Sequence, residues 1–250
     1  MDDMVHGAGD ILAEPSSPRA PEVKPIRKIG IIGAGQMGGG IAHVVALSGY
    51  DVAINDLAKE RVEAAIQTID KNLSRQIASG KISEDERGKA LARISFAETF
   101  AGFTDADLVI EAATEDETVK RKIFVALCPY LKPDAIVATN TSSISITRLA
   151  ASTDRPEHFI GLHFMNPVPV MELVEMIRGI ATEDVTFGRT KDFVESLGKT
   201  TAVSEDFPAF MVNRILLPMI NEAIYTLYEG VGTVEAIDKA MRLGAHHPMG

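Results

Sequence analysis

Residues 28–38 read KIGIIGAGQMG, and this stretch decides the fold. Its apolar first half, residues 28–32, predicts a short buried strand. The strand leads directly into a G-x-G-x-x-G pattern formed by Gly33, Gly35 and Gly38. Apolar residues at helical spacing follow, and residues 51–55 predict a second strand that ends at Asp56. This succession of strand, glycine turn, helix, strand and acid is typical of a dinucleotide-binding βαβ unit.

Each residue of the pattern has a physical role in holding a dinucleotide. Gly33 permits the tight turn, Gly35 lets a diphosphate approach the backbone, and Gly38 allows the helix to pack closely. The N–H groups at the helix start attract phosphate. Asp56 would accept hydrogen bonds from the adenosine ribose hydroxyls and repel a 2′-phosphate. The pattern therefore favours NAD over NADP, and the alternative is a glycine turn that only shapes the fold.

A helical stretch over residues 58–93 interrupts the alternation of strands and helices. Apolar spacing predicts a first helix, Ser79-Gly80 a stop, and Ser83 with Glu86 a capping box that begins a second helix. We interpret the stretch as an inserted helical hairpin. It concentrates the basic residues Lys71, Arg75, Lys81, Arg87, Lys89 and Arg93. They indicate either a solvated helix face or a site for a phosphorylated substrate handle.

The alternation resumes after the hairpin. Further strands are predicted at residues 94–96, 107–111, 136–139, 159–164, 173–177 and 200–203. Thr114 and Glu117 predict a capping box at the start of a helix that runs to about residue 131. A further helix is predicted over about residues 183–197. From residue 206 the pattern is helical only, over 209–229 and 234–243. The sequence thus predicts an α/β, Rossmann-type, mostly parallel sheet over residues 26–205, followed by the start of an all-α second domain over 206–250.

Composition limits the classes of function. The chain has 250 residues, a net charge of −10 and one cysteine, Cys128, which disfavours nonspecific nucleic-acid binding and a cysteine-based metal site. We expect no metal, because His246-His247 has no third ligand at a suitable spacing. No apolar run approaches a membrane span of about 20 residues. Residues 1–25 are rich in proline and acids, so they predict a disordered tail without a targeting signal, and we expect a cytoplasmic protein.

The most informative stretch for chemistry is GLHFMNPVPVMELVE, residues 161–175. The prolines predict a turn between two apolar strands. If the chain reverses about Pro169, then His163 and Glu175, each six residues away, face each other. A carboxylate on one imidazole nitrogen fixes the tautomer and prepares the other nitrogen as a general base. The alternative is a strand histidine whose ring is merely satisfied by a neighbour.

Several polar residues should share one edge of the sheet with the glycine pattern. The carboxyl ends of parallel strands meet at that edge, which places Glu115, the loop 140–142 and His163 along it. Ser142 and Asn213 could hold a substrate hydroxyl or carbonyl. A base beside a dinucleotide predicts oxidation of an alcohol without metal: His163 takes the hydroxyl proton while a hydride leaves to the nicotinamide.

Four stretches together resemble the 3-hydroxyacyl-CoA dehydrogenase family, and most closely its short bacterial 3-hydroxybutyryl-CoA dehydrogenases. They are GAGQMG (33–38), NTSS (140–143), GLHFMNPVPVMELVE (161–175) and DFPAFMVNRILLPMINEAIYTLYEG (206–230). The resemblance extends over about residues 26–250, and the last two stretches are specific to the family. It implies NAD-dependent interconversion of short-chain (3S)-3-hydroxyacyl-CoA and 3-ketoacyl-CoA in fatty acid or butanoate metabolism.

The resemblance also implies roles for individual residues. His163 would be the base and Glu175 its partner, with Ser142 and Asn213 assisting at the substrate. The residues expected around NAD are Gly33, Gly35, Gln36, Met37, Gly38, Asp56, Glu115, Lys120, Asn140, Ser142 and Asn166. From its helical position alone, Lys120 would be a solvated residue. In the family the helical hairpin helps to hold CoA.

Two other hypotheses stay open at this point. Family members continue past residue 250 with helices that complete the second domain and its dimer interface, so we expect a truncated second domain here and a homodimer where that domain is complete. The chain could then be a catalytically impaired NAD-binding protein with a structural or regulatory role. A third hypothesis is a dehydrogenase of free β-hydroxyacids, but those use an active-site lysine for which the sequence shows no matching motif.

Overall fold

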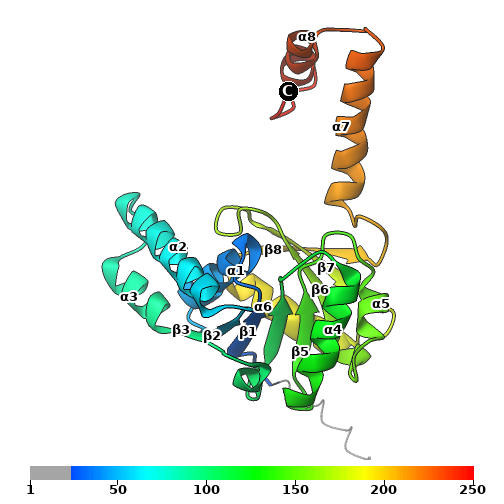
Figure 1. The fold of residues 1–250 in the computed structure, drawn as a ribbon. Coiled ribbons are helices and arrows are strands. Elements are labelled where there is room, and N and C mark those ends of the chain that lie inside the picture. Colours follow the sequence, from blue (N-terminus) through cyan, green and yellow to red (C-terminus); the bar gives the residue numbers. More distant parts are fainter. Residues whose placement is uncertain (1–23) are drawn as a thin grey trace, which may run out of the picture.

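The computed structural model describes residues 24–250, and an eight-stranded sheet forms the body of this part of the chain (Figure 1). The strands are β1 (Lys28–Ile32), β2 (Asp51–Asn55), β3 (Ile94–Phe96), β4 (Leu108–Glu111), β5 (Ile136–Thr139), β6 (Phe159–Phe164), β7 (Leu173–Arg178) and β8 (Thr200–Glu205). Their order is β3-β2-β1-β4-β5-β6-β7-β8, and only the β6–β7 pair is antiparallel. The predicted Rossmann-type sheet is confirmed. The tail predicted over residues 1–25 lies, except for its last two residues, outside the described residues.

Helices cover both faces of the sheet, because alternate residues of the strands point in opposite directions. The helices are α1 (Gln36–Leu47), α2 (Lys59–Ala78), α3 (Glu84–Ala92), α4 (Glu117–Leu127), α5 (Ile146–Ala150), α6 (Asp184–Ser196), α7 (Val212–Tyr228) and α8 (Val234–Lys239), with the short turns η1 (Phe100–Phe103), η2 (Cys128–Tyr130), η3 (Pro156–His158) and η4 (Ala240–Gly244). One core joins Ile29 and Ile31 of β1 to α1, α2, α3 and α6. The other joins Ile32 to η1, α4 and α5.

The order of the strands places a ligand site at one edge of the sheet. β1 lies between β2 and β4, so the chain runs outward to β3 and then returns to the other side of β1. Ligands of open α/β sheets bind beyond the carboxyl ends of the strands at such a switch point. The glycine turn follows β1 and Glu111 ends β4, so both lie at this edge.

The inserted hairpin is confirmed as α2 and α3, and Ser83 with Glu86 forms the predicted capping box. The predicted capping box of Thr114 and Glu117 is wrong. The helix begins at Glu117, so the capping residue is Asp116, whose side chain accepts a hydrogen bond from the Val119 amide. Glu117 instead pairs with Arg148 of α5.

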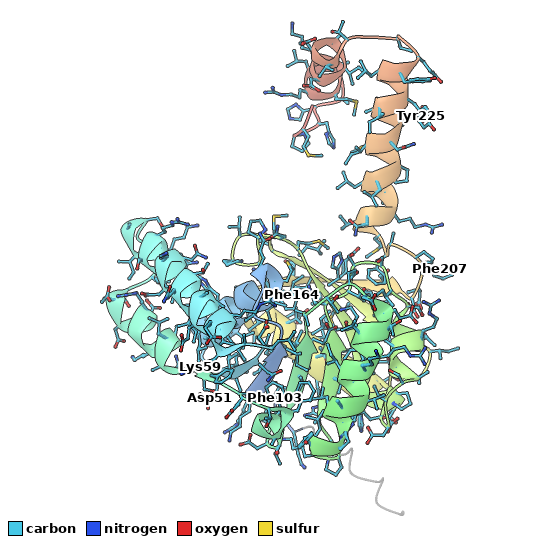
Figure 2. All side chains as sticks on the ribbon, in the orientation of Figure 1. Asp51, Lys59, Phe103, Phe164, Phe207 and Tyr225 are labelled. Atoms are coloured by element: carbon cyan, nitrogen blue, oxygen red, sulfur yellow. The ribbon has the colours of Figure 1, made fainter. Side chains whose placement is uncertain are left out.

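Helices α7 and α8 stand away from the sheet (Figure 1). Within residues 24–250, no residue of either helix is buried. Figure 2 shows Phe207 where the chain leaves the sheet and Tyr225 far along α7. Helix α7 begins at Val212 and not at residue 209 as predicted, because Ala209 and Phe210 have φ angles of 65° and 52°. These angles lie in the left-handed region, so the two residues cannot belong to a right-handed α-helix.

Candidate active site

The glycine turn has the shape that a dinucleotide requires. A Cβ on Gly38 would lie 1.8 Å from the Gly33 carbonyl oxygen, and one on Gly33 would meet Ala113, so neither position accepts another residue. Gly33 also has a φ of 101°. A Cβ on Gly35 would meet nothing within 4 Å, which leaves open space above the backbone. Gly35 precedes α1 without a side-chain cap, so the helix start offers N–H groups to a diphosphate in that space.

Asp56 lies beside the glycine turn, as the pattern predicts. Its Oδ2 accepts from the Ala34 amide at 2.7 Å and its Oδ1 from the Leu57 amide at 2.7 Å. The exposed Arg61 guanidinium lies 3.3 Å from Oδ1. The carboxylate therefore supports the turn directly and keeps acceptor capacity for a ribose hydroxyl at Oδ2, which accepts one hydrogen bond and has a second lone pair.

Replacing Asp56 with serine should change the choice of cofactor. Serine removes the charge that repels a 2′-phosphate and frees Arg61 to pair with it. We expect the ratio of kcat/KM for NADH to that for NADPH to fall roughly tenfold, which corresponds to about 1.4 kcal/mol. Steady-state rates with NADH and NADPH at one fixed substrate concentration measure the ratio. An unchanged ratio would show that Asp56 does not select the cofactor.

His163 and Glu175 form the predicted pair across the proline turn. In the antiparallel β6–β7 ladder His163 lies opposite Glu175, and His163 Nδ1 is 2.8 Å from Glu175 Oε2. The glutamate is fully buried, while the histidine keeps 8% of its surface exposed. Because a carboxylate only accepts, Nδ1 carries the proton, and Nε2 has its lone pair free for a substrate proton. Lys199 steadies the turn by donating to the Val168 and Met171 carbonyls.

The second oxygen of Glu175 has partners that the sequence did not indicate. Glu175 Oε1 accepts from the backbone amides of Met211 and Val212 at 3.0 and 2.9 Å. These amides begin α7, and Met211 has no side-chain cap of its own. Glu175 therefore caps α7 with one oxygen and orients His163 with the other. The amides at the start of a helix carry partial positive charge, which attracts the carboxylate group.

Glu115 organises the loop after β5. Its Oε1 accepts from the Ser142 amide at 2.7 Å, from the Ser142 hydroxyl at 2.9 Å and from the Thr141 hydroxyl at 2.8 Å. Burial raises the pKa of Glu115, but these donors outweigh it and the pKa lies below the usual range. The Ser142 hydroxyl is thus held at the cavity by Glu115, and a rotation about its C–O bond would turn its proton toward an oxygen in the cavity. Asn140 Oδ1 accepts from the Phe164 amide at 2.9 Å, which ties the loop to β6.

Lys120 is not the solvated residue that its helical position suggests. Its side chain is 1% exposed, and Nζ lies 2.6 Å from Oε2 of the fully buried Glu111. The Thr139 hydroxyl donates to the same oxygen at 2.8 Å, and Glu115 lies 3.8 Å from Nζ. Glu111 was missed because nothing near it in sequence marks a partner. The Lys120 ammonium thus lies between two carboxylates: that of Glu111 at the end of β4, and that of Glu115, which holds the loop after β5.

Two cavities adjoin at this edge. The rim cavity, of about 530 Å³, brings together most of the predicted residues and is lined by Gly35, Gln36, Met37, Ala112, Ala113, Thr114, Glu115, Asn140, Ser142, His163, Phe164, Met165, Asn166 and Asn213. The hairpin cavity, of about 540 Å³, is lined by Ala34, Gly35, Gln36, Gly39, Gly40, His43, Asp56, Arg61, Ala64, Ala65, Thr68, Ile69, Asn72, Asn166, Pro167, Val168 and Pro169. Asn166 lines both. Four predicted residues line neither cavity. Gly33 and Gly38 shape the glycine turn, and Lys120 and Glu175 are buried.

His43 is a further titratable group at the wall of the hairpin cavity. It is 1% exposed, and neither ring nitrogen has a hydrogen-bond partner among the described residues. Burial lowers the pKa of His43 below 6.5; the neighbouring Gln76 side chain raises it by less than burial lowers it, and Lys199 makes a small further contribution downward. The unfolded chain therefore binds a proton more readily than the folded chain does. As the pH falls below 6.5, proton binding therefore favours the unfolded chain, and the free energy of unfolding decreases.

Replacing His43 with leucine should reduce this sensitivity to acid. The variant has no group to protonate on unfolding, so its melting temperature should fall less than that of the wild type between about pH 7.5 and about pH 5.5. Thermal melts at the two pH values measure the difference. His246→Asn, at an exposed position, is the matched control and should keep the wild-type dependence. Equal dependence in all three proteins would show that His43 is not buried in its neutral form.

Among residues 24–250 no cluster of three His, Cys, Asp or Glu side chains could hold a metal ion. In the same part of the chain, each helix is too short or too polar to cross a membrane. A glycine turn at the switch point and a histidine held by a carboxylate in the adjoining cavity define an NAD-dependent dehydrogenase.

Comparison with known proteins makes the assignment more specific. Residues 28–207 match the 3-hydroxyacyl-CoA dehydrogenase NAD binding domain, and residues 210–250 match the C-terminal domain of the same family. The chain therefore belongs to the 3-hydroxyacyl-CoA dehydrogenase family.

Individual relatives agree with this assignment. The chain is 68% identical to a 3-hydroxybutyryl-CoA dehydrogenase of Bradyrhizobium diazoefficiens over 90% of this chain and 77% of that protein. It is 48% identical to a probable 3-hydroxybutyryl-CoA dehydrogenase of Bacillus subtilis over 90% and 78%. The crystal structure of (S)-3-hydroxybutyryl-CoA dehydrogenase from Ralstonia eutropha matches with a TM-score of 0.88 and 45% identity, over 90% of this chain and 80% of that one. The hypothesis of a catalytically impaired NAD-binding protein gains no support from these relatives.

Proposed function

We propose that the protein oxidises short-chain (3S)-3-hydroxyacyl-CoA, such as 3-hydroxybutyryl-CoA, to 3-ketoacyl-CoA with NAD, and catalyses the reverse reduction. The observation that carries the proposal is the 2.8 Å contact from His163 Nδ1 to Glu175, made beside the cavity that the glycine turn also lines. It leaves Nε2 of the histidine as the proton acceptor at that cavity. NAD supplies the hydride acceptor when it is bound.

Each residue around the rim cavity has a proposed task. His163 removes the proton of the 3-hydroxyl group in the oxidation and returns it to the ketone oxygen in the reduction. Glu175 holds the ring in one tautomer and favours the imidazolium that forms. Ser142, which donates to Glu115 in the free protein, turns its hydroxyl to donate to the substrate oxygen, because the single proton of the substrate hydroxyl goes to His163. Asn213, at the start of α7, has an amide that can donate to the substrate oxygen.

We place NAD on the glycine turn, with Asp56 at the adenosine ribose. Gly33, Gly35, Gln36, Met37, Gly38, Glu115, Lys120, Asn140, Ser142 and Asn166 complete the proposed cofactor site. The hairpin cavity contains Asp56 and shares Gly35, Gln36 and Asn166 with the rim cavity, so the adenosine half of NAD would lie there. The CoA handle would then lie along the hairpin outside this cavity. Arg87 and Lys89 of the hairpin pair with neighbouring acids, so we assign the phosphate contacts to other basic residues of 71–93.

We further propose that residues 26–205 and 206–250 belong to separate domains, and that the protein is cytoplasmic and forms a homodimer through the second domain where that domain is complete. The support for a dimer is the apolar surface of α7, where Ile215 is 70% exposed and Tyr228 is 84% exposed. Solution molar mass measured by light scattering tests this part.

The reaction is tested by NADH formation from three substrates under one set of conditions. We expect turnover of (3S)-3-hydroxybutyryl-CoA and little of the (3R) isomer or of free 3-hydroxybutyrate. Turnover of the free acid but not of the thioester would support the free-acid hypothesis. Binding of NADH without turnover of any 3-hydroxyacyl-CoA would contradict the proposal.

A further inference from the structure

The joint between β8 and α7, residues 206–212, is fixed at both ends by carboxylates. Asp206 accepts from the Ser145 hydroxyl and from the Ile146 and Thr147 amides, which begin α5. At the other end, Glu175 accepts from the amides of Met211 and Val212. Between these two anchors the chain adopts left-handed backbone at two successive residues, neither of them glycine. Such a conformation persists only where surrounding contacts impose it.

The side chain of Phe210 makes the buried contact of this joint. Although α7 is exposed along its length, Phe210 is 2% exposed and belongs to the core beneath α4 and α5. Its ring centroid lies 5.8 Å from that of His163, with the two planes at 57°. Phe210 therefore packs directly against the ring that must face the substrate.

Phe210 also determines where the next two amides point. Because Met211 and Val212 follow it directly, the seating of Phe210 sets the position of both N–H groups on Glu175 Oε1. The other oxygen of the same carboxylate holds His163 Nδ1 at 2.8 Å. One apolar side chain thus fixes the histidine from two sides, by packing on its ring and by orienting its carboxylate partner.

We propose that Phe210 is a positioning residue for the base: it seats the start of α7 so that Glu175 and His163 take the reacting geometry. It acts through these two residues and does not touch the substrate. The inference rests on the proposed function for its effect on turnover, but the geometry of the pair can be measured without turnover. A consequence is that any shift of the first turn of α7 away from β7 must also withdraw both amides from Glu175.

The experiment compares Phe210→Leu and Phe210→Ala with Phe124→Leu. Phe124 is equally buried, on α4 against Phe159 and away from both cavities, so Phe124→Leu is a matched loss of aromatic packing. Two readouts are taken on the full chain: kcat and KM for acetoacetyl-CoA, and the proton NMR signal of the Nδ1–H of His163. That signal is observable only while the Glu175 hydrogen bond protects the proton from exchange with water.

We expect kcat to fall about tenfold in Phe210→Leu and on the order of 100-fold in Phe210→Ala, with KM changed less than about twofold, since small misplacements of a catalytic group have effects of this size. The NMR signal should broaden or vanish in both variants, whereas Phe124→Leu should keep the signal and kcat. If Phe210→Ala does not fold, the leucine variant decides.

An unchanged signal and kcat in Phe210→Leu, or equal losses in Phe124→Leu, would overturn the proposal. If the wild type shows the protected signal but no turnover, then the proposed function fails, and the effect of Phe210→Leu on the signal still tests the positioning role.

Discussion

His163→Ala should lower kcat by about 10²–10⁴-fold, the usual contribution of a general acid or base. The reason is that Nε2 of His163 is the free ring nitrogen at the rim cavity, while Nδ1 is engaged by Glu175. The KM for NADH should change little, because the glycine turn and Asp56 lie on other elements. Initial rates of NADH oxidation with acetoacetyl-CoA measure the effect.

Loss of activity alone does not distinguish a missing base from a disturbed fold. His163→Gln is the better control variant, because its amide can still donate to the buried Glu175 and so avoids leaving that carboxylate without its partner. It should fold and bind NADH as the wild type does, with kcat as low as in the alanine variant. Turnover close to that of the wild type in either variant would remove His163 from the mechanism.

Lys120→Met should produce the largest loss of stability. The Lys120 ammonium and the Glu111 carboxylate, 2.6 Å apart, are 1% and 0% exposed. Methionine keeps the volume but leaves Glu111 charged and without a countercharge. Breaking a buried pair from one side costs about 3–5 kcal/mol. We therefore expect the free energy of unfolding, measured by urea denaturation, to fall by that amount.

Two further variants show whether the pair is the cause. Lys122→Met, on the exposed face of the same helix, should change the free energy of unfolding by less than about 0.5 kcal/mol. Adding Glu111→Gln to Lys120→Met removes the uncompensated charge and should recover part of the loss. If Lys120→Met is no less stable than Lys122→Met, the buried ion pair does not contribute as the structure indicates.

The predictions made from local patterns agree best with the structure. The strand, glycine turn and helix at 28–47 depend on residues that are close in sequence, and they form as predicted. The pairing of His163 with Glu175 was accessible because an antiparallel turn relates residues at equal distances from its centre. The inserted hairpin followed from helical spacing and its capping box.

The sequence could not indicate contacts between elements that are distant along the chain. Lys120 was misjudged because its partner, Glu111, lies on a strand, and a helical position alone does not reveal what it faces. The start of α7 was placed too early because residue 210 is held in left-handed backbone by burial against the sheet. For the same reason the two amides on Glu175 had no signal in the sequence.

The most direct test of the account is the rate of NADH consumption by the full chain with acetoacetyl-CoA, measured in parallel for the wild type and His163→Gln. The account predicts steady oxidation of NADH that requires acetoacetyl-CoA and falls by at least about 100-fold in the variant. Oxidation that is equal in the two proteins, or NADH binding by the wild type without any oxidation, would contradict it.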